Sequence, residues 1–207
     1  MLIRRLQRGF NLVEAIVAIS ILGLLVAAAV PSMADWVRSS QVRNLAETTQ
    51  AGLQKARMEA MKRNRTVGFW LVGPAATAPL TDSCVLASNS GAWVVSLENP
   101  AGKCATAVSD TVSPRIVETY APGTASNGLT VSALTATGTT AATSVTFNGY
   151  GQIQATVNPL ARIDISHASD TGARKLRVEV SANGAIRMCD RNVVAPDPRA
   201  CNLAASP

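Results

Sequence analysis

The hydrophobic pattern divides the chain into two unlike parts. Residues 10–30 read FNLVEAIVAISILGLLVAAAV, an apolar run in which Glu14 is the only charged residue. As a helix that rises about 1.5 Å per residue, this run is about 30 Å long and matches the hydrocarbon core of a bilayer. We therefore expect a membrane-spanning helix over residues 10–30.

Beyond Pro31 the apolar run becomes an amphipathic pattern. Pro31 removes one backbone donor and is expected to bend the helix. We predict one long helix over about residues 10–64, whose second half, within 31–65, packs an apolar stripe against a globular lobe. The stripe follows three- and four-residue spacings and comprises Val42, Leu45, Ala46, Thr49, Leu53, Ala56 and Ala60.

From residue 66 the pattern changes to short β-branched or alternating runs separated by Gly, Pro, Asn and Ser. This predicts a β-rich lobe over 66–207 with antiparallel sheets, and hairpin turns at Asn148–Gly149 and Asn183–Gly184. The segment 121–143 is rich in Ala, Thr, Gly and Ser and is expected to be a long exposed loop. A helix followed by strands gives an α+β fold. The predicted strands are 67–72, 93–98, 115–120, 144–148, 161–166 and 175–181.

The charge pattern indicates membrane orientation. The formal net charge is +6, and three of the positive charges, Arg4, Arg5 and Arg8, precede Gly9. Basic residues are retained in the cytoplasm, so the lobe is expected to cross the membrane. An ordinary secretory signal would be cleaved after the apolar run, where no clear site stands. A plain signal anchor leaves Glu14 unexplained, because a carboxylate in a bilayer is costly and usually functional.

The four cysteines form two spaced pairs, Cys84 with Cys104 and Cys189 with Cys201. Neither pair has the close spacing of a zinc knuckle, and the chain has one histidine, His167, so no metal or cofactor is expected. An even number behind an export segment favours disulfides over free thiols. Three connectivities are possible, and the short loops favour pairing within each spaced pair.

Residues 9–14, GFNLVE, resemble the type IV pilin (class III) signal. In that family a membrane prepilin peptidase cuts after the glycine and the new N-terminal residue is N-methylated. The resemblance implies a leader over 1–9, cleavage between Gly9 and Phe10, and methylation of Phe10. It also makes Pro31 the helix-kinking proline and gives Glu14 an assembly role, pairing with the Phe10 amine of a neighbouring subunit. Asn11 departs from the commoner Thr.

Residues 53–64, LQKARMEAMKRN, match each fixed position of the pattern L-x-x-A-R-x-E-A-x-x-R-N of the GspH/FimT/FimU branch. Residues 147–151, 184–190 and 197–201 are also similar. The branch contains minor pilins of type IV pili and minor pseudopilins of type II secretion, which prime assembly near the filament tip. The resemblance implies a minor pilin supporting twitching motility and adhesion. A GspH-like minor pseudopilin is the alternative; the paired C-terminal cysteines look more like FimU and FimT.

The same resemblance implies partners and a location. The partners would be the prepilin peptidase, the major pilin and other minor pilins or pseudopilins. The chain would be a single-pass protein of the inner membrane, with a cytoplasmic N-terminus and a periplasmic lobe, and would then enter the pilus or pseudopilus.

A second alternative is a DNA-binding minor pilin for natural transformation. FimT-like members bind DNA through a Gly-Arg-x-Arg element, which here reads GAIR over residues 184–187 and lacks one arginine. Arg187, Arg191 and Arg199 are the candidate phosphate contacts, and a solvated loop held by a disulfide is the simpler interpretation.

No catalytic site is expected. The chain lacks a phosphate-binding Gly loop and a Gly-x-Ser-x-Gly elbow. Asp164 and His167 are near each other without a nucleophile, so we interpret them as a polar strand end.

Overall fold

The structure is a computed structural model of the chain. It describes residues 11–74, 79–169 and 174–201, without the side chains of 27–32 and 125–126. The chain divides into two compact units, Met1–Val37 and Arg38–Pro207.

The long helix is α1, Leu12–Arg63. It is continuous through Pro31, and the bend expected there stays a prediction. Its C-terminal end is a Schellman motif, in which the Arg65 amide donates to the Ala60 carbonyl at 3.2 Å. Asn64 takes the left-handed position with φ 48°, a conformation that asparagine tolerates better than most residues. The predicted helix is therefore confirmed in its described part.

In the unit Met1–Val37, the described residues form the first half of α1, and its apolar side chains are exposed. Leu12 is 75% exposed, Ile19 69% and Leu24 74%. Within residues 11–74, 79–169 and 174–201, no helix has the length and apolarity that a membrane span requires.

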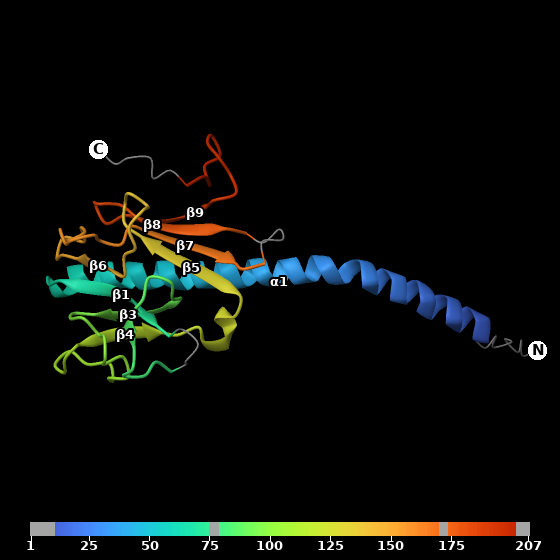
Figure 1. The fold of residues 1–207 in the computed structure, drawn as a ribbon, viewed down its shortest axis with the longest axis horizontal. Helices are drawn as coiled ribbons and strands as arrows, with labels where there is room; N and C mark the ends of the chain where they lie inside the picture. The colour runs from blue at the N-terminus through green and yellow to red at the C-terminus, as the bar shows by residue number, and fades with distance from the viewer. Residues whose placement is uncertain (1–10, 75–78, 170–173, 202–207) are drawn as a thin grey trace, which may run out of the picture. The chain divides into compact units, whose positions relative to one another are not determined.

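In the unit Arg38–Pro207, the apolar stripe of α1 is the centre of the core. All seven predicted stripe positions are buried, none more than 2% exposed, so the amphipathic prediction is confirmed. All of them except Thr49 share one apolar cluster with side chains from both sheets, such as Phe69 and Ile165. Gly52 allows one close approach, because a Cβ there would lie 2.8 Å from the Trp93 ring. Figure 1 shows the two sheets on either side of this half of α1.

The first sheet, sheet A, is antiparallel and lies on one side of α1. Its order is β2-β1-β3-β4, and β6 also pairs with β1. The strands are β1 Val67–Gly73, β2 Val85–Leu86, β3 Ala92–Ser96, β4 Ile116–Tyr120 and β6 Ser144–Phe147.

Both faces of sheet A are buried. Trp93 points from β3 into the cluster that contains the α1 stripe, and Val94 points into a second cluster on the opposite face. That second cluster includes Ile116, Cys84 and Cys104. This explains why β1 and β3 have near-continuous apolar sequences instead of alternating ones.

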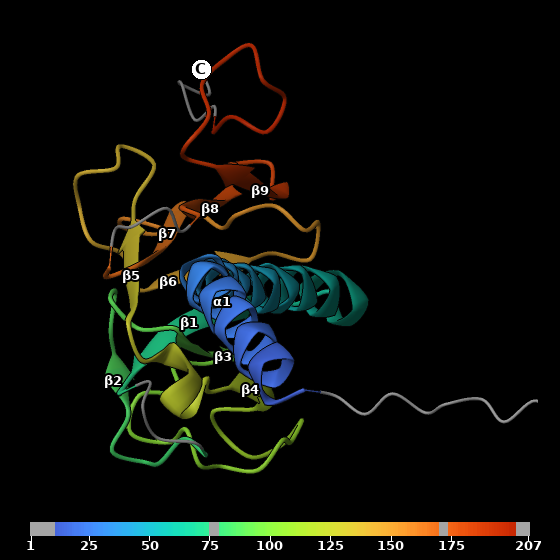
Figure 2. The same cartoon turned by 90° about the vertical axis from the view of Figure 1, so that its right-hand side faces the viewer.

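The second sheet, sheet B, is antiparallel with the order β5-β7-β8-β9. Its strands are β5 Leu129–Leu134, β7 Arg162–His167, β8 Leu176–Val180 and β9 Ile186–Asp190. Asn183 and Gly184 form the turn between β8 and β9, as predicted, with Gly184 at φ 79°. Figure 2, which looks along the lobe half of α1, shows the two sheets meeting beside the helix.

The expectation of a long exposed loop over 121–143 is wrong. This segment contains a short 3-10 helix, η1 Gly123–Ser126, and the whole of β5. Ala133 in β5 is only 1% exposed, and its amide donates to the Ser88 carbonyl at 2.8 Å. The small Ala and Thr side chains of β5 fit the space available, because β5 is hydrogen-bonded to β7 on one side and to the loop after β2 on the other. The α+β prediction for the chain is confirmed.

Candidate functional site

Three of the four sequence stretches that carry the resemblance, 53–64, 147–151 and 184–190, meet where α1 ends. The Arg57 Nε donates to the Gly151 carbonyl at 2.9 Å. A Cβ on Gly149 would lie 2.3 Å from the Asn64 Oδ1, and a Cβ on Gly184 would lie 1.9 Å from the Gly151 carbonyl oxygen. The glycines are therefore required because backbone segments touch there. We call this meeting point, residues 57–64, 147–151 and 184, the junction.

The turn 148–152 of the junction is held by one side chain. The Asn148 Oδ1 accepts hydrogen bonds from the Tyr150 amide at 3.0 Å and the Gln152 amide at 3.1 Å. Gly151 sits at φ 73°, and a Cβ on it would be 2.8 Å from the Met61 Sδ. The turn leaves Tyr150 84% exposed. A fixed turn thus presents a large aromatic side chain to solvent.

Glu59, also in the junction, is a buried carboxylate with cations from its own helix. Arg63 Nε lies 2.7 Å from its carboxylate, and Lys55 and Lys62 lie at 3.7 and 3.9 Å. The hydrogen bond from Arg63, aided by the charges of all three cations, lowers the pKa of Glu59. Arg63 also pairs with Asp110, and the hydrogen bonds to both carboxylates raise the pKa of Arg63. Glu59 is therefore the buried centre of a network whose outer members, such as Lys62 and Asp110, are exposed.

Glu14 has the opposite surroundings. Its side chain is exposed, and within the part of the chain that the structure describes it has no hydrogen-bond or ion-pair partner. Val13 and Val17 beside it are 63% and 51% exposed. Gly9 and Phe10, the predicted cleavage and methylation residues, lie outside the described residues. Glu14 is therefore a lone charge on an exposed apolar helix surface.

Two disulfides fix the lobe. They join Cys84 to Cys104 and Cys189 to Cys201, the pairs that the short loops favoured, and no cysteine is free. The first lies in the apolar cluster on the outer side of sheet A. The second ties the C-terminal segment to β9, where the Asp190 amide donates to the Arg199 carbonyl at 2.8 Å.

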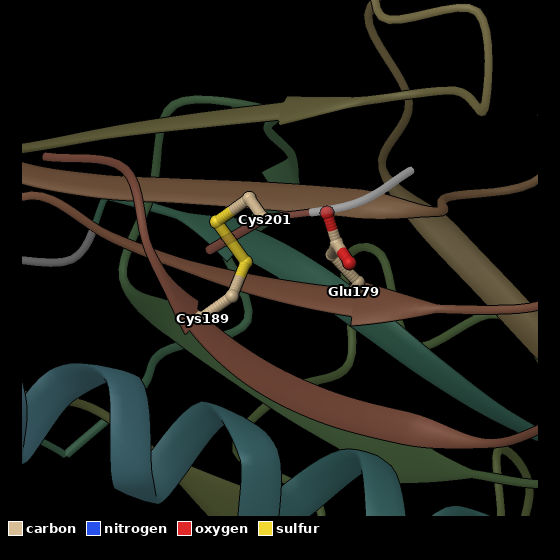
Figure 3. Close-up of side chains that lie close together, drawn as sticks. All are labelled: Glu179, Cys189 and Cys201. Carbon is tan, nitrogen blue, oxygen red and sulfur yellow. A yellow bond between two sulfur atoms is a disulfide. The ribbon is translucent and has the colours of Figure 1, made fainter. Parts of the chain in front are cut away.

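Figure 3 shows the second disulfide beside the carboxylate of Glu179. Among the described residues this is the one group of three potential metal ligands, with ligand atoms within 4.8 Å of one another. The two sulfurs are bonded to each other, so neither is the thiolate that a metal requires. The Oε2 of Glu179 accepts from the Arg187 Nε at 2.9 Å. The group is an ion-paired strand position next to a disulfide.

The outer face of sheet B is a network of opposite charges. Asp164 accepts from Arg177 at 3.0 Å and lies 3.5 Å from Arg191, while Glu179 holds Arg187. Both carboxylates are buried, with Asp164 8% and Glu179 2% exposed, so the polar side of the alternating β8 sequence is not open to solvent. The hydrogen bond to Asp164 raises the pKa of Arg177. Strand register creates these pairs, because Asp164 lies opposite Arg177 and Glu179 opposite Arg187.

The third candidate DNA contact, Arg199, is also paired. Its guanidinium donates to both carboxylate oxygens of Asp197, at 2.8 and 3.2 Å. These hydrogen bonds lower the pKa of Asp197 to about 2. The candidates Arg187, Arg191 and Arg199 therefore each face a carboxylate of the chain instead of forming an open cationic surface.

Two protein-family models match the chain. The family model described as "Type II transport protein GspH" matches residues 45–184, and the model of the prokaryotic N-terminal methylation motif matches residues 4–30. A search of curated proteins gave no match.

Two crystal structures of the type IV minor pilin FimU from Pseudomonas aeruginosa strain PAO1 are similar to the chain, each at 15% identity. The form in space group P65 has a TM-score of 0.43 and covers 70% of this chain and 90% of that one. The form in space group P21 has a TM-score of 0.46 and covers 72% and 88%.

The GspH match extends from Leu45 in the buried α1 stripe to the turn between β8 and β9, and so includes the junction. The methylation motif precedes it over residues 4–30 and includes the apolar part of α1. The chain therefore belongs to the GspH family of type IV pilin-like proteins.

Proposed function

We propose that the chain is a minor pilin of a type IV pilus, a structural subunit that primes assembly near the tip and supports twitching motility and adhesion. The observation that carries this proposal is the first half of α1, whose apolar side chains are exposed around the single carboxylate of Glu14. Such a surface is stable in a membrane and then in the core of a filament. The family consists of structural pilin-like subunits, and the methylation motif implies a membrane anchor.

In this proposal, Glu14 aligns neighbouring subunits. The prepilin peptidase removes residues 1–9 and exposes the amine of Phe10, which is then methylated. A carboxylate in an apolar medium needs a cation close by, and the Phe10 amine of an adjacent subunit supplies it. If the two helices slide out of this register, the Glu14 carboxylate and the Phe10 amine both lose their partner. The ion pair therefore selects one register between the two helices.

Before assembly, the proposal places the chain in the inner membrane as a single-pass protein. The leader arginines Arg4, Arg5 and Arg8 keep the N-terminus in the cytoplasm, and the lobe lies in the periplasm. The two disulfides of the lobe suit that oxidising compartment.

The second candidate function is a minor pseudopilin of type II secretion, favoured by the description of the matching family model. The disulfide between Cys189 and Cys201 supports the pilus, since paired C-terminal cysteines resemble the pilus members of the branch. DNA binding for transformation is the third candidate. The ion pairs of Arg187, Arg191 and Arg199 count against it.

Partner identity tests the proposal. The full-length chain is cross-linked in cells that produce it, purified from detergent-solubilised membranes, and its partners are identified by mass spectrometry. We expect other minor pilins and the major pilin. Recovery of secretion pseudopilins instead would establish the second candidate, and recovery of neither would overturn a filament role.

The N-terminus is read in the same preparation. We expect a mature chain that begins with methylated Phe10. A chain cleaved near Ala29 would be an ordinary secreted protein and would contradict the proposal.

A further inference from the structure

The two segments that meet at the junction carry three exposed side chains with large apolar surfaces. Met58 is 55% exposed, Met61 42% and Tyr150 84%. The two methionines are in the last turns of α1, and the turn that carries Tyr150 is fixed to the helix by the hydrogen bond between Arg57 and Gly151. We name Met58, Met61 and Tyr150 the junction patch.

The junction patch is held in place before any partner binds. Asn148 fixes the turn, and Gly151 packs on Met61. A large exposed aromatic side chain on a fixed turn loses little conformational entropy on binding. Removing its apolar surface from water also makes the free energy of binding more favourable. Val157 is even more exposed, at 92%, and lies seven residues after Tyr150 in the same connection between β6 and β7, beyond the turn that Asn148 fixes.

The border of the patch is positively charged. Lys55 and Lys62 lie three and four residues from Met58 along the helix, so they flank it on one face. Glu59 is buried and already surrounded by three cations. The end of α1 and its partners carry an excess of three positive charges. The five cations are Lys55, Arg57, Lys62, Arg63 and Arg65, and the two carboxylates are Glu59 and Asp110.

We propose that the junction patch docks a different pilin-like subunit, one that offers an apolar recess bordered by Asp and Glu. The inference rests on the proposed function, in which this chain is one subunit of a mixed assembly. An apolar centre with aromatic and Met side chains and a charged rim is the anatomy of a protein interface. Flexible methionines adapt to such a recess.

The same features select against two other occupants. A second copy that used this face would bring its own excess of positive charge against the first. Nucleic acid is disfavoured because the centre is two methionines and one aromatic ring, where single strands need several stacking platforms. In addition, Arg57 already donates to the Gly151 carbonyl, and Arg63 already pairs with Glu59 and Asp110, so neither guanidinium is open to a phosphate.

The test compares variants of the full-length chain in cells that produce the native partners, with cross-linking and quantitative mass spectrometry. Tyr150→Ala should lower recovery of the partner subunit about tenfold, which corresponds to about 1.4 kcal/mol. Tyr150→Phe should stay within about twofold of wild type, since the ring is retained. Lys62→Glu should also lower recovery, because it places a carboxylate against the acidic border.

Val157→Ala is the matched control, an exposed apolar residue outside the patch, and should leave recovery unchanged. Thermal unfolding of each variant verifies that the lobe is intact. Wild-type recovery with Tyr150→Ala overturns the patch and leaves the proposed function standing. A wild-type chain that recovers no pilin-like subunit overturns the proposed function and the patch together. Recovery of only its own copies, or a loss of recovery after nuclease treatment, overturns the choice of partner.

Discussion

Two carboxylates in one helix have opposite surroundings. Glu59 is buried and has Lys55, Lys62 and Arg63 within 4 Å or less. Glu14 is exposed among apolar side chains and has no partner in the described part of the chain. Both are in α1, so helix geometry alone does not explain the difference. Glu59 in the lobe half is neutralised within its own helix, whereas Glu14 in the first half is not neutralised by any described residue.

The apolar side chains show the same contrast. Leu53 in the lobe half is fully buried, and Leu25 in the first half is 64% exposed. Burying a leucine contributes about 1.5–3 kcal/mol, so Leu53 stabilises the folded lobe, whereas the exposed Leu25 contributes little to it. The stability of the lobe should therefore be independent of the first half of α1. Mutations in the two halves of α1 test whether the lobe is stable without the first half.

Leu53→Ala should have the largest effect. Removing a fully buried leucine leaves a cavity against both sheets and should lower the free energy of unfolding by about 2–5 kcal/mol. The measurement is urea unfolding of the full-length chain in detergent, followed by near-ultraviolet circular dichroism of the lobe.

Leu25→Ala is the matched control and should change the free energy of unfolding by less than about 0.5 kcal/mol. A comparable loss in both variants would show that the lobe depends on the first half of the helix, and the contrast between the halves would be wrong.

The same contrast separates the features that the sequence predicts from those that depend on the folded lobe. The buried stripe was predictable because its period fixes which residues share a face, whatever the partner. The strand β5 was missed because Ala133 and its small neighbours have weak strand propensity, and only packing between β7 and the Ser88 loop makes the segment a strand. For Glu179 the alternation was visible, but its arginine partner lies on another strand, and the register that joins them is not local.

The junction shows the same limit. Its stretches were recognisable by resemblance, yet nothing in their spacing shows that Gly149 and Gly151 lie against the helix end or that Gly184 lies against Gly151. Close backbone contact is a property of the folded lobe.

Removing the disulfide between Cys84 and Cys104, as a double Ser variant, should have the next largest effect. The cross-link spans 20 residues and lies in the second apolar cluster. Its loss should lower the free energy of unfolding by about 3 kcal/mol in the chain-entropy description. The same urea experiment measures it, with helix content of the first half of α1 as the quantity that should stay constant. An unchanged unfolding midpoint would show that the bridge is dispensable for the lobe.

Glu59→Gln should have a smaller effect that depends on pH. The pKa of Glu59 is lowered in the folded lobe from an ordinary value of 4.5, so its stabilisation is fully present above that value and lost as pH falls through the folded pKa. The variant should be less stable than wild type by about 1–3 kcal/mol at neutral pH, and the gap should close in acid. Unfolding curves at a series of pH values measure this. A gap that stays constant with pH would remove the ionic account of Glu59.

Glu14→Gln should have the smallest effect on the lobe, below about 0.5 kcal/mol, because the side chain has no partner there. It keeps the size of the side chain and removes its charge, so cleavage after Gly9 should continue while the chain no longer enters filaments. Quantitative mass spectrometry of sheared filaments and membranes measures both. Glu47→Gln is the control, since Glu47 forms only an exposed pair with Arg43 at 3.4 Å. Normal entry of the Glu14 variant would show that the charge has no role in assembly. Loss of entry with an intact lobe would locate the need for a partner in the first half of the helix.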